Sequence, residues 1–241
     1  MAARRITRKE MKRDEFITAI GRFTLWMEDH AREALIVGGV LVAAALGSVF
    51  FFQYLGEREV KASALLARGV EMLHATVRGA GDPAAPAGGL VYGSTDEKYR
   101  SVIDQMDALI QTYPRSQSGR LALYYKGLAL TGLRKPQEAV KTLEEFLAAS
   151  PDSFAAPMAR AALARALDDA GEPQKAVDLY EQLAQDAKGV YPPQEALWEM
   201  GLCLERMGKK DEAKKVYERL TRDFPDSDYS QEAQGRLKSL S

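Results

Sequence analysis

A period of 37 residues constrains the fold of this chain more than any other feature. Alanines recur at this spacing, and twelve residues before each of them lies another small residue. The alanines are Ala139, Ala176 and Ala213, and the earlier positions hold Gly127, Ala164 and Gly201. A fixed period of this kind indicates a repeat architecture, in which each unit buries its apolar face against its neighbours. We therefore expect a stack of similar units.

Each unit is expected to be a pair of helices. In the most regular unit these helices are expected over residues 116–131 and 136–149, joined by a turn at Gly132. The next two units are expected to turn at Gly171 and Gly208. Proline at position 136 suits the first turn of a helix, where its missing N–H costs nothing. The serines that follow the Pro-Arg and Pro-Asp pairs can cap the next helix.

The first unit and the end of the chain depart from this plan. The first helix is expected over residues 57–78, and a weaker copy of the second runs over 99–116. Between them, residues 79–95 are rich in glycine, proline and alanine and are expected to form a flexible insertion. Within it, Leu90, Val91 and Tyr92 either anchor the loop or dock a partner. Residues 227–240 are expected to form a helix that caps the stack.

The small-residue, alanine and proline positions resemble the tetratricopeptide repeat. The sequence departs from that repeat in two ways. The period exceeds the usual ~34 residues, and the tryptophan expected early in the first helix is absent. Leu123 and Leu197 occupy that position instead. The resemblance implies an α-solenoid that binds other proteins on a concave surface lined by the first helices.

A second feature is an uninterrupted apolar stretch over residues 34–55, bounded by Glu33 and Glu57. At ~1.5 Å per residue, a helix of this length crosses a hydrocarbon core of ~30 Å. A cleaved signal peptide is the alternative, but acids precede the stretch and no small residue pair marks its end. The chain is therefore expected to be all-α, with one transmembrane helix followed by about four helix-turn-helix repeats and a C-terminal capping helix.

Lysine and arginine counts predict the orientation of this span. Eight such residues precede it, and three follow it closely. Because positive flanks stay in the cytoplasm, we expect residues 1–33 to be cytoplasmic and residues 56–241 to be extracytoplasmic. These eight are Arg4, Arg5, Arg8, Lys9, Lys12, Arg13, Arg22 and Arg32, and the three are Arg58, Lys61 and Arg68.

The membrane-proximal region offers two further candidates. Gly39, Ala43 and Gly47 line one face of the span and would let a second helix approach closely. The alternative is that small residues are merely common in membrane helices. Before the span, four apolar residues share one helical face, which predicts an amphipathic helix at the membrane surface or a plain solvated helix. They are Phe16, Ile20, Phe23 and Met27, with Trp26 beside them.

No pattern typical of catalysis or of a cofactor site occurs. The sequence lacks phosphate-loop, zinc-protease, nucleophile-elbow and paired-cysteine motifs. The single cysteine, Cys203, lies beside Gly201 on a repeat helix and is expected to be a packed thiol. With a net charge of −1, nothing favours nucleic acid. We expect no enzyme activity, no metal, no cofactor and no small-molecule substrate.

Transferring the repeat register to the first helices gives a candidate protein-binding groove. Its aromatic and aliphatic members would anchor a peptide or an unfolded segment. The alternative is that Tyr124 and Trp198 pack between adjacent units. The candidates are Leu121, Tyr124, Leu128, Met158, Arg165, Glu195, Trp198 and Leu202.

The overall layout resembles a more specific group. A short tail from Asp14 to Trp26, a single span, a long exit helix and tetratricopeptide hairpins are similar to bacterial inner-membrane proteins of the YfgM type. The resemblance implies an ancillary subunit of the Sec translocon that works with a membrane-anchored periplasmic chaperone on unfolded, emerging clients. The other interpretation is a scaffold for cell-envelope assembly or cell division, working with outer-membrane or cell-wall machinery.

Overall fold

A computed structural model describes residues 21, 26, 30–78, 90–186 and 189–240. The expected amphipathic helix and most of the expected insertion lie outside the described residues. The chain divides into two compact units, residues 1–57 and 58–241. Each unit is described separately below.

In the first unit, the described segment is the beginning of α2, which runs from Ala31 to His74. An 18-residue window of this helix has a mean hydropathy of 2.5, and none of the window is buried. Leu35 and Phe50 are 77% and 73% exposed. The helix is therefore long and apolar enough to cross a membrane, and the exposure of its apolar stretch is unlike that of a core helix in a soluble protein.

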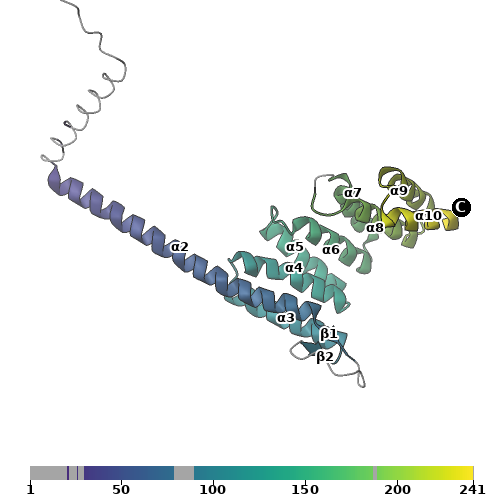
Figure 1. Ribbon diagram of the computed structural model, residues 1–241, viewed down its shortest axis with the longest axis horizontal. Coiled ribbons are helices and arrows are strands. Elements are labelled where there is room, and N and C mark those ends of the chain that lie inside the picture. The colour runs from purple at the N-terminus through teal and green to yellow at the C-terminus, as the bar shows by residue number, and fades with distance from the viewer. Residues whose placement is uncertain (1–20, 22–25, 27–29, 79–89, 187–188, 241) are drawn as a thin grey trace, which may run out of the picture. The chain divides into compact units, whose positions relative to one another are not determined.

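The second unit is a succession of helices in which each packs against the next (Figure 1). After the last part of α2, the helices pair as α4–α5, α6–α7 and α8–α9, and α10 follows. Their bounds are α3 Thr95–Thr112, α4 Gln117–Gly132, α5 Pro136–Ala149, α6 Ala156–Asp169, α7 Pro173–Gln185, α8 Pro193–Arg206, α9 Lys210–Asp223 and α10 Asp228–Leu240. The predicted all-α solenoid with a C-terminal helix is confirmed.

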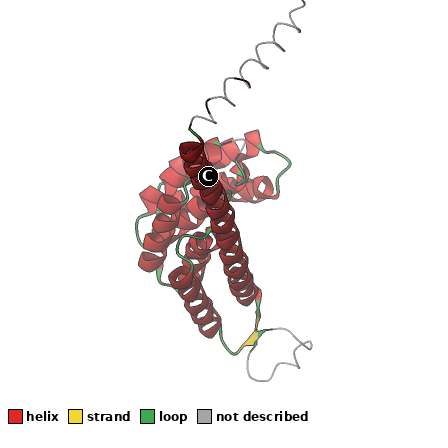
Figure 2. Ribbon diagram, turned by 90° about the vertical axis from the view of Figure 1, so that its left-hand side faces the viewer, coloured by secondary structure: helices red, strands yellow, loops and turns green. Residues whose placement is uncertain are grey.

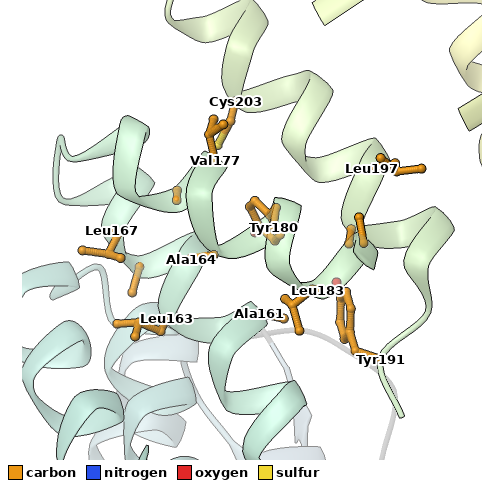
Figure 3. Packing of buried hydrophobic residues seen from close by; sticks show 14 of the residues in the cluster. Ala161, Leu163, Ala164, Leu167, Val177, Tyr180, Leu183, Tyr191, Leu197 and Cys203 are labelled. Atoms are coloured by element: carbon orange, nitrogen blue, oxygen red, sulfur yellow. The ribbon is translucent and has the colours of Figure 1, made fainter. Parts of the chain in front are cut away.

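Small residues explain why two helices of a unit lie so close together. A Cβ added to Gly127 would lie 2.6 Å from the Leu143 side chain, and one added to Gly201 would lie 2.3 Å from the Tyr217 ring. All three period alanines are fully buried. Figure 3 shows part of the continuous core in which α6, α7 and α8 meet. The 37-residue period thus marks the positions where backbones approach most closely.

The turns between paired helices correct one expectation. Gly171 and Gly208 have φ of +85° and +75°, and the residue at the same position in the preceding unit is Arg134, with φ of +57°. Gly132, expected at that turn, is instead the last residue of α4. A Cβ there would lie 2.3 Å from the ring of Tyr99, so this glycine serves close packing against α3.

The first repeat is completed by the end of α2. Ala62 is fully buried with Met106 and Leu109 of α3, and Leu65 and Leu66 pack against this cluster. Helix α2 ends at His74, short of the expected residue 78. Thr76 and Val77 form β1, which pairs in parallel with β2 at Val91 and Tyr92. Figure 2 shows this strand pair in yellow. The β-branched residues favour the strand, whose pairing holds the end of the expected insertion in place.

Helix α10 covers the last repeat. Ala233 is fully buried, and Tyr229 packs against the main core. Ser227 precedes the helix, and its hydroxyl accepts a hydrogen bond from the N–H of Ser230 at 3.1 Å. The equivalent cap at α4 is Ser116, which accepts from Gly119 N–H at 2.8 Å. These two serines confirm the capping role expected from the sequence. The expectation is wrong for Ser153, because Ala155 is the N-cap of α6 and no side chain caps that helix.

Candidate protein-binding groove

The first helices of three units line one groove of about 360 Å³. Five of the expected binding residues meet there, and they are Tyr124, Leu128, Met158, Arg165 and Glu195. Helices α4, α6 and α8 supply them, so the register of the repeat brings distant parts of the sequence to one surface. The other lining residues are Tyr99, Thr131, Gly132, Ala161, Ala162, Tyr180 and Tyr191.

Four tyrosines give the groove an aromatic surface. The Tyr124 ring lies 5.9 Å from that of Phe146, which fixes it against α5. Burial raises the pKa of Tyr180 and Tyr191, with a further contribution from Glu199 for the first and Glu195 for the second. These phenols therefore keep their protons at neutral pH. Because Tyr180 and Tyr191 are only 2% and 7% exposed, the accessible aromatic surface comes mainly from the half-buried Tyr99 and Tyr124, whose rings suit contact with a polypeptide.

Arg165 provides the positive charge of the groove. Its guanidinium donates to Glu199 Oε1 at 2.8 Å, and its side chain is 58% exposed. Its charge also lies close enough to Tyr180 to oppose the rise in the pKa of that hydroxyl. Burial alone would lower the pKa of Arg165, but Glu199 outweighs that effect and raises it. Nearby, the charge of the Glu195 carboxylate contributes to the raised pKa of Tyr191. The charges at this end of the groove are therefore fixed in place.

A second depression of about 270 Å³ continues from the same arginine. It shares Arg165 and Tyr180 with the groove and is otherwise lined by charged residues. Arg206 of α8 pairs with Asp168 of α6 across it. The remaining lining residues are Asp169 and Glu199. An aromatic groove thus opens directly onto a charged surface.

Three of the expected binding residues do not line the groove. Leu121 packs against the main core. Leu202 is half-buried on α8 and lines neither depression. The Trp198 ring lies 5.6 Å from that of Tyr217 and 6.3 Å from that of Tyr229, so it packs towards α9 and α10. Trp198 therefore packs between helices, which was the alternative to its being an anchor in the groove.

Sequence reasoning missed the tyrosines outside the first helices. Tyr99 comes from α3, Tyr180 from α7 and Tyr191 from the segment before α8. Tyr180 lies 37 residues after Leu143 and 37 before Tyr217, where the repeat places a large apolar side chain. Its period of 37 residues marks that packing role and gives no sign that its hydroxyl reaches the groove. Tyr191 stands beside Pro192 and Pro193, and this pair was the available signal for a fixed loop there.

Among the described residues of the first unit, nothing packs closely against Gly39 or Gly47 on the small-residue face of α2. A Cβ added at Gly39 or Gly47 would meet nothing within 4 Å, and Ala43 is exposed. Cys203, in contrast, is fully buried in the second unit, as expected. Within the described residues, no group of histidine, cysteine, aspartate and glutamate side chains has the arrangement of a metal site.

Comparison with known proteins identifies the repeat in two segments of the chain. Residues 124–189 and 195–227 each match a tetratricopeptide-repeat model. These segments are tetratricopeptide repeats. They include α6 and α7 in one match and most of α8 and all of α9 in the other, and so hold most of the groove. The repeats indicate a scaffold for protein–protein interaction, a fold that is typically non-enzymatic.

Solved structures show the same fold at low identity. The TPR-like repeats of a kinesin-light-chain-like protein from Podosopora anserina match with a TM-score of 0.52 and 18% identity, over 59% of this chain and 77% of that one. A tetratricopeptide repeat protein from Parabacteroides merdae matches with a TM-score of 0.53 and 15% identity, over 74% of this chain and 59% of that one. No curated protein matches the sequence.

Proposed function

We propose that this chain is a membrane-anchored, non-enzymatic protein that binds extended polypeptide segments of other proteins in its tetratricopeptide groove. The observation that carries the proposal is the groove itself, where Tyr124, Leu128 and Met158 present apolar surface beside the hydroxyl groups of buried tyrosines. Peptide recognition commonly combines apolar anchors with a few fixed polar groups. No metal, cofactor or small-molecule substrate forms part of this function.

The membrane anchor is the helix of residues 34–55. Its support is the full exposure of an apolar stretch that would otherwise face water. In this proposal, residues 1–33 stay in the cytoplasm of a bacterial cell, and residues 56–241 form the periplasmic domain. The excess of lysine and arginine before the span supports this orientation. The proposed site is the inner membrane, with Gly39, Ala43 and Gly47 facing a second membrane helix.

The clients we propose are unfolded proteins that emerge from the Sec translocon, with a membrane-anchored periplasmic chaperone as a partner. The support is the layout of tail, span, exit helix and repeats, which resembles the YfgM type. An accessory protein beside the translocon would meet extended chains before they fold, and a groove lined by tyrosines suits such chains. A scaffold for envelope assembly would share the same fold and topology, so its partners, once captured, would distinguish the two functions.

The binding test uses the full chain in lipid nanodiscs. A reduced, unfolded client is mixed with wild type, with Leu128→Ser plus Met158→Ser, or with Phe154→Ser. Phe154 is 77% exposed and does not line the groove, so its variant removes exposed apolar surface elsewhere. We expect the groove variant to lose at least about tenfold in affinity, because two apolar anchors contribute roughly 1 kcal/mol or more each. The control should bind as wild type does.

Two results would count against this function. Equal binding by the groove variant and wild type would move the binding site elsewhere, and the absence of client binding by wild type would remove the chaperone-like role. Partner identity is tested by affinity purification from gently solubilised membranes, followed by mass spectrometry. Translocon subunits with a periplasmic chaperone are the expected result. Recovery of cell-wall or outer-membrane assembly proteins instead would favour the scaffold.

A further inference from the structure

The charges around the groove are unequal in number. Four carboxylates line the groove and the adjoining depression, from Asp168, Asp169, Glu195 and Glu199. Two guanidinium groups, from Arg165 and Arg206, line the same surface. Four negative charges against two positive charges leave −2, although the whole chain carries only −1. The excess is therefore concentrated beside the aromatic surface.

Both guanidinium groups are already engaged. Arg165 donates to Glu199, whose side chain is only 19% exposed, and Arg206 pairs with Asp168, whose side chain is 11% exposed. An acidic ligand would have to compete with these partly desolvated pairs, and breaking one would leave a poorly hydrated carboxylate without its partner. The two arginines therefore give little attraction for an anion.

The remaining two carboxylates account for the excess. Asp169 is exposed and forms no ion pair with any residue that the structure describes. Glu195 lines the groove and forms no ion pair with any residue that the structure describes. A cation brought to either group would gain attraction without displacing a positive partner. Two unneutralised carboxylates thus stand at the edge of an apolar, tyrosine-rich surface.

We infer that the groove selects extended polypeptide segments in which lysine or arginine lies next to large apolar residues. The inference rests on the proposed function and adds the chemistry of the ligand to it. Apolar side chains occupy the surface formed by Tyr124, Leu128 and Met158, and the basic side chains reach Glu195 and Asp169. The methylene stems of lysine and arginine also cover aromatic surface while their charged ends remain hydrated.

The test compares three fluorescent peptides of equal length on the full chain in nanodiscs of neutral lipid. All three have leucine and phenylalanine at alternate positions, and the intervening residues are lysine, glutamine or glutamate. We expect the lysine peptide to bind about three- to thirty-fold more tightly than the glutamine peptide, as two exposed charge pairs allow. The glutamate peptide should bind most weakly. The preference should shrink in high salt, because screening shortens the range of exposed charges.

Matched variants locate the effect. Asp169→Asn with Glu195→Gln should reduce the preference for the lysine peptide over the glutamine peptide to below about threefold. Glu145→Gln with Glu218→Gln removes the same charge from exposed positions on the second helices and should keep the preference. Equal affinity for all three peptides, or a preference that survives in the groove variant, would overturn the inference alone. If none of the peptides binds, the proposed function fails with it.

Discussion

The N-terminus of α4 is closed by a side chain from another helix, and this contact gives the sharpest stability prediction. Glu59 of α2 accepts hydrogen bonds from the N–H groups of Gln117 and Ser118, both at 2.9 Å, and from Ser118 Oγ at 2.7 Å. The first N–H groups of a helix have no partner within the helix, and a negative charge there also opposes the positive end of the helix dipole. Glu59 therefore ties α2 to the second repeat.

The expected magnitude follows from these three hydrogen bonds. Glu59→Ala leaves the Ser118 hydroxyl without its acceptor, and Ser118 is only 6% exposed. A hydrogen bond to a charged group contributes ~1.5–3 kcal/mol, but water can reach part of this site, so we expect a total loss of about 2–3 kcal/mol. Glu59→Gln keeps one acceptor oxygen and should lose about 1–1.5 kcal/mol.

The pH dependence has a definite sign. Burial alone would raise the pKa of Glu59, but hydrogen bonds from Ser118 and Gln117, helped by Arg120, hold it below the ordinary value of 4.5. A carboxylate with a lowered pKa stabilises the folded state fully above the unfolded pKa, and this contribution is lost as the pH falls through the folded pKa. The difference in stability between wild type and Glu59→Gln should therefore be constant near neutrality and shrink below about pH 4.5.

Urea unfolding of the full chain in detergent, followed by circular dichroism, measures the loss, and hydrogen exchange locates it. Because repeat arrays unfold in parts, exchange in the peptide that begins α4 is the more specific observable. Glu71→Gln is the control, since Glu71 is exposed on the same helix, and it should change stability by less than about 0.5 kcal/mol. Equal effects of the two substitutions, or a Glu59 effect that persists in acid, would refute the reasoning.

Four further variants or reactions test other parts of the second unit. Arg134→Gly should stabilise the chain by up to about 1 kcal/mol, because φ of +57° disfavours a residue with Cβ. Gly171→Ala, at the equivalent turn, should destabilise the chain by about 1 kcal/mol or more. Urea unfolding measures both variants, and effects of the same sign would contradict the left-handed conformation assigned to these two positions. Ser230→Ala should raise the unfolding midpoint by the equivalent of about 1 kcal/mol, because the buried Ser230 hydroxyl finds no hydrogen-bond partner among the described residues. Cys203 should resist alkylation at pH 8 and react once urea unfolds the chain, since burial, and then Asp168, raise the pKa of its thiol to about 12. Fast labelling of the native chain would show that this helix opens.

The repeat and its packing could be predicted because they rest on backbone geometry. Where two helices approach closely, only a glycine or an alanine fits, so Gly127 and Ala139 reveal the contact in the sequence itself. The prediction of a turn at Gly132 was wrong for a related reason. A glycine at the end of a helix can serve either a left-handed turn or a close contact, and here Tyr99 takes the space that a side chain would need. Arg134 occupies the left-handed position instead.

The groove could be predicted only in part. Its first-helix residues follow from the repeat register, which is why Tyr124, Leu128 and Met158 lie on one surface. Tyr180 could not be assigned in this way, because a long side chain that begins in the core can end at the surface. Tyr180 packs in the main core and also lines the groove. Periodicity identifies where a side chain starts and not where its last atom lies.

Trp198 shows how the end of a repeat array changes the meaning of its residues. Glu195 lies one turn earlier on the same helix and lines the groove, whereas Trp198 does not. The helix that packs next to this unit is α10, which contacts both α8 and α9. Tyr229 of α10 lies on one side of the Trp198 ring and Tyr217 of α9 lies near it as well. The large ring therefore serves the junction with the capping helix, where an apolar surface would otherwise face water. An anchor residue inferred from the repeat register is accordingly more secure in an internal unit, such as Met158, than in the terminal one.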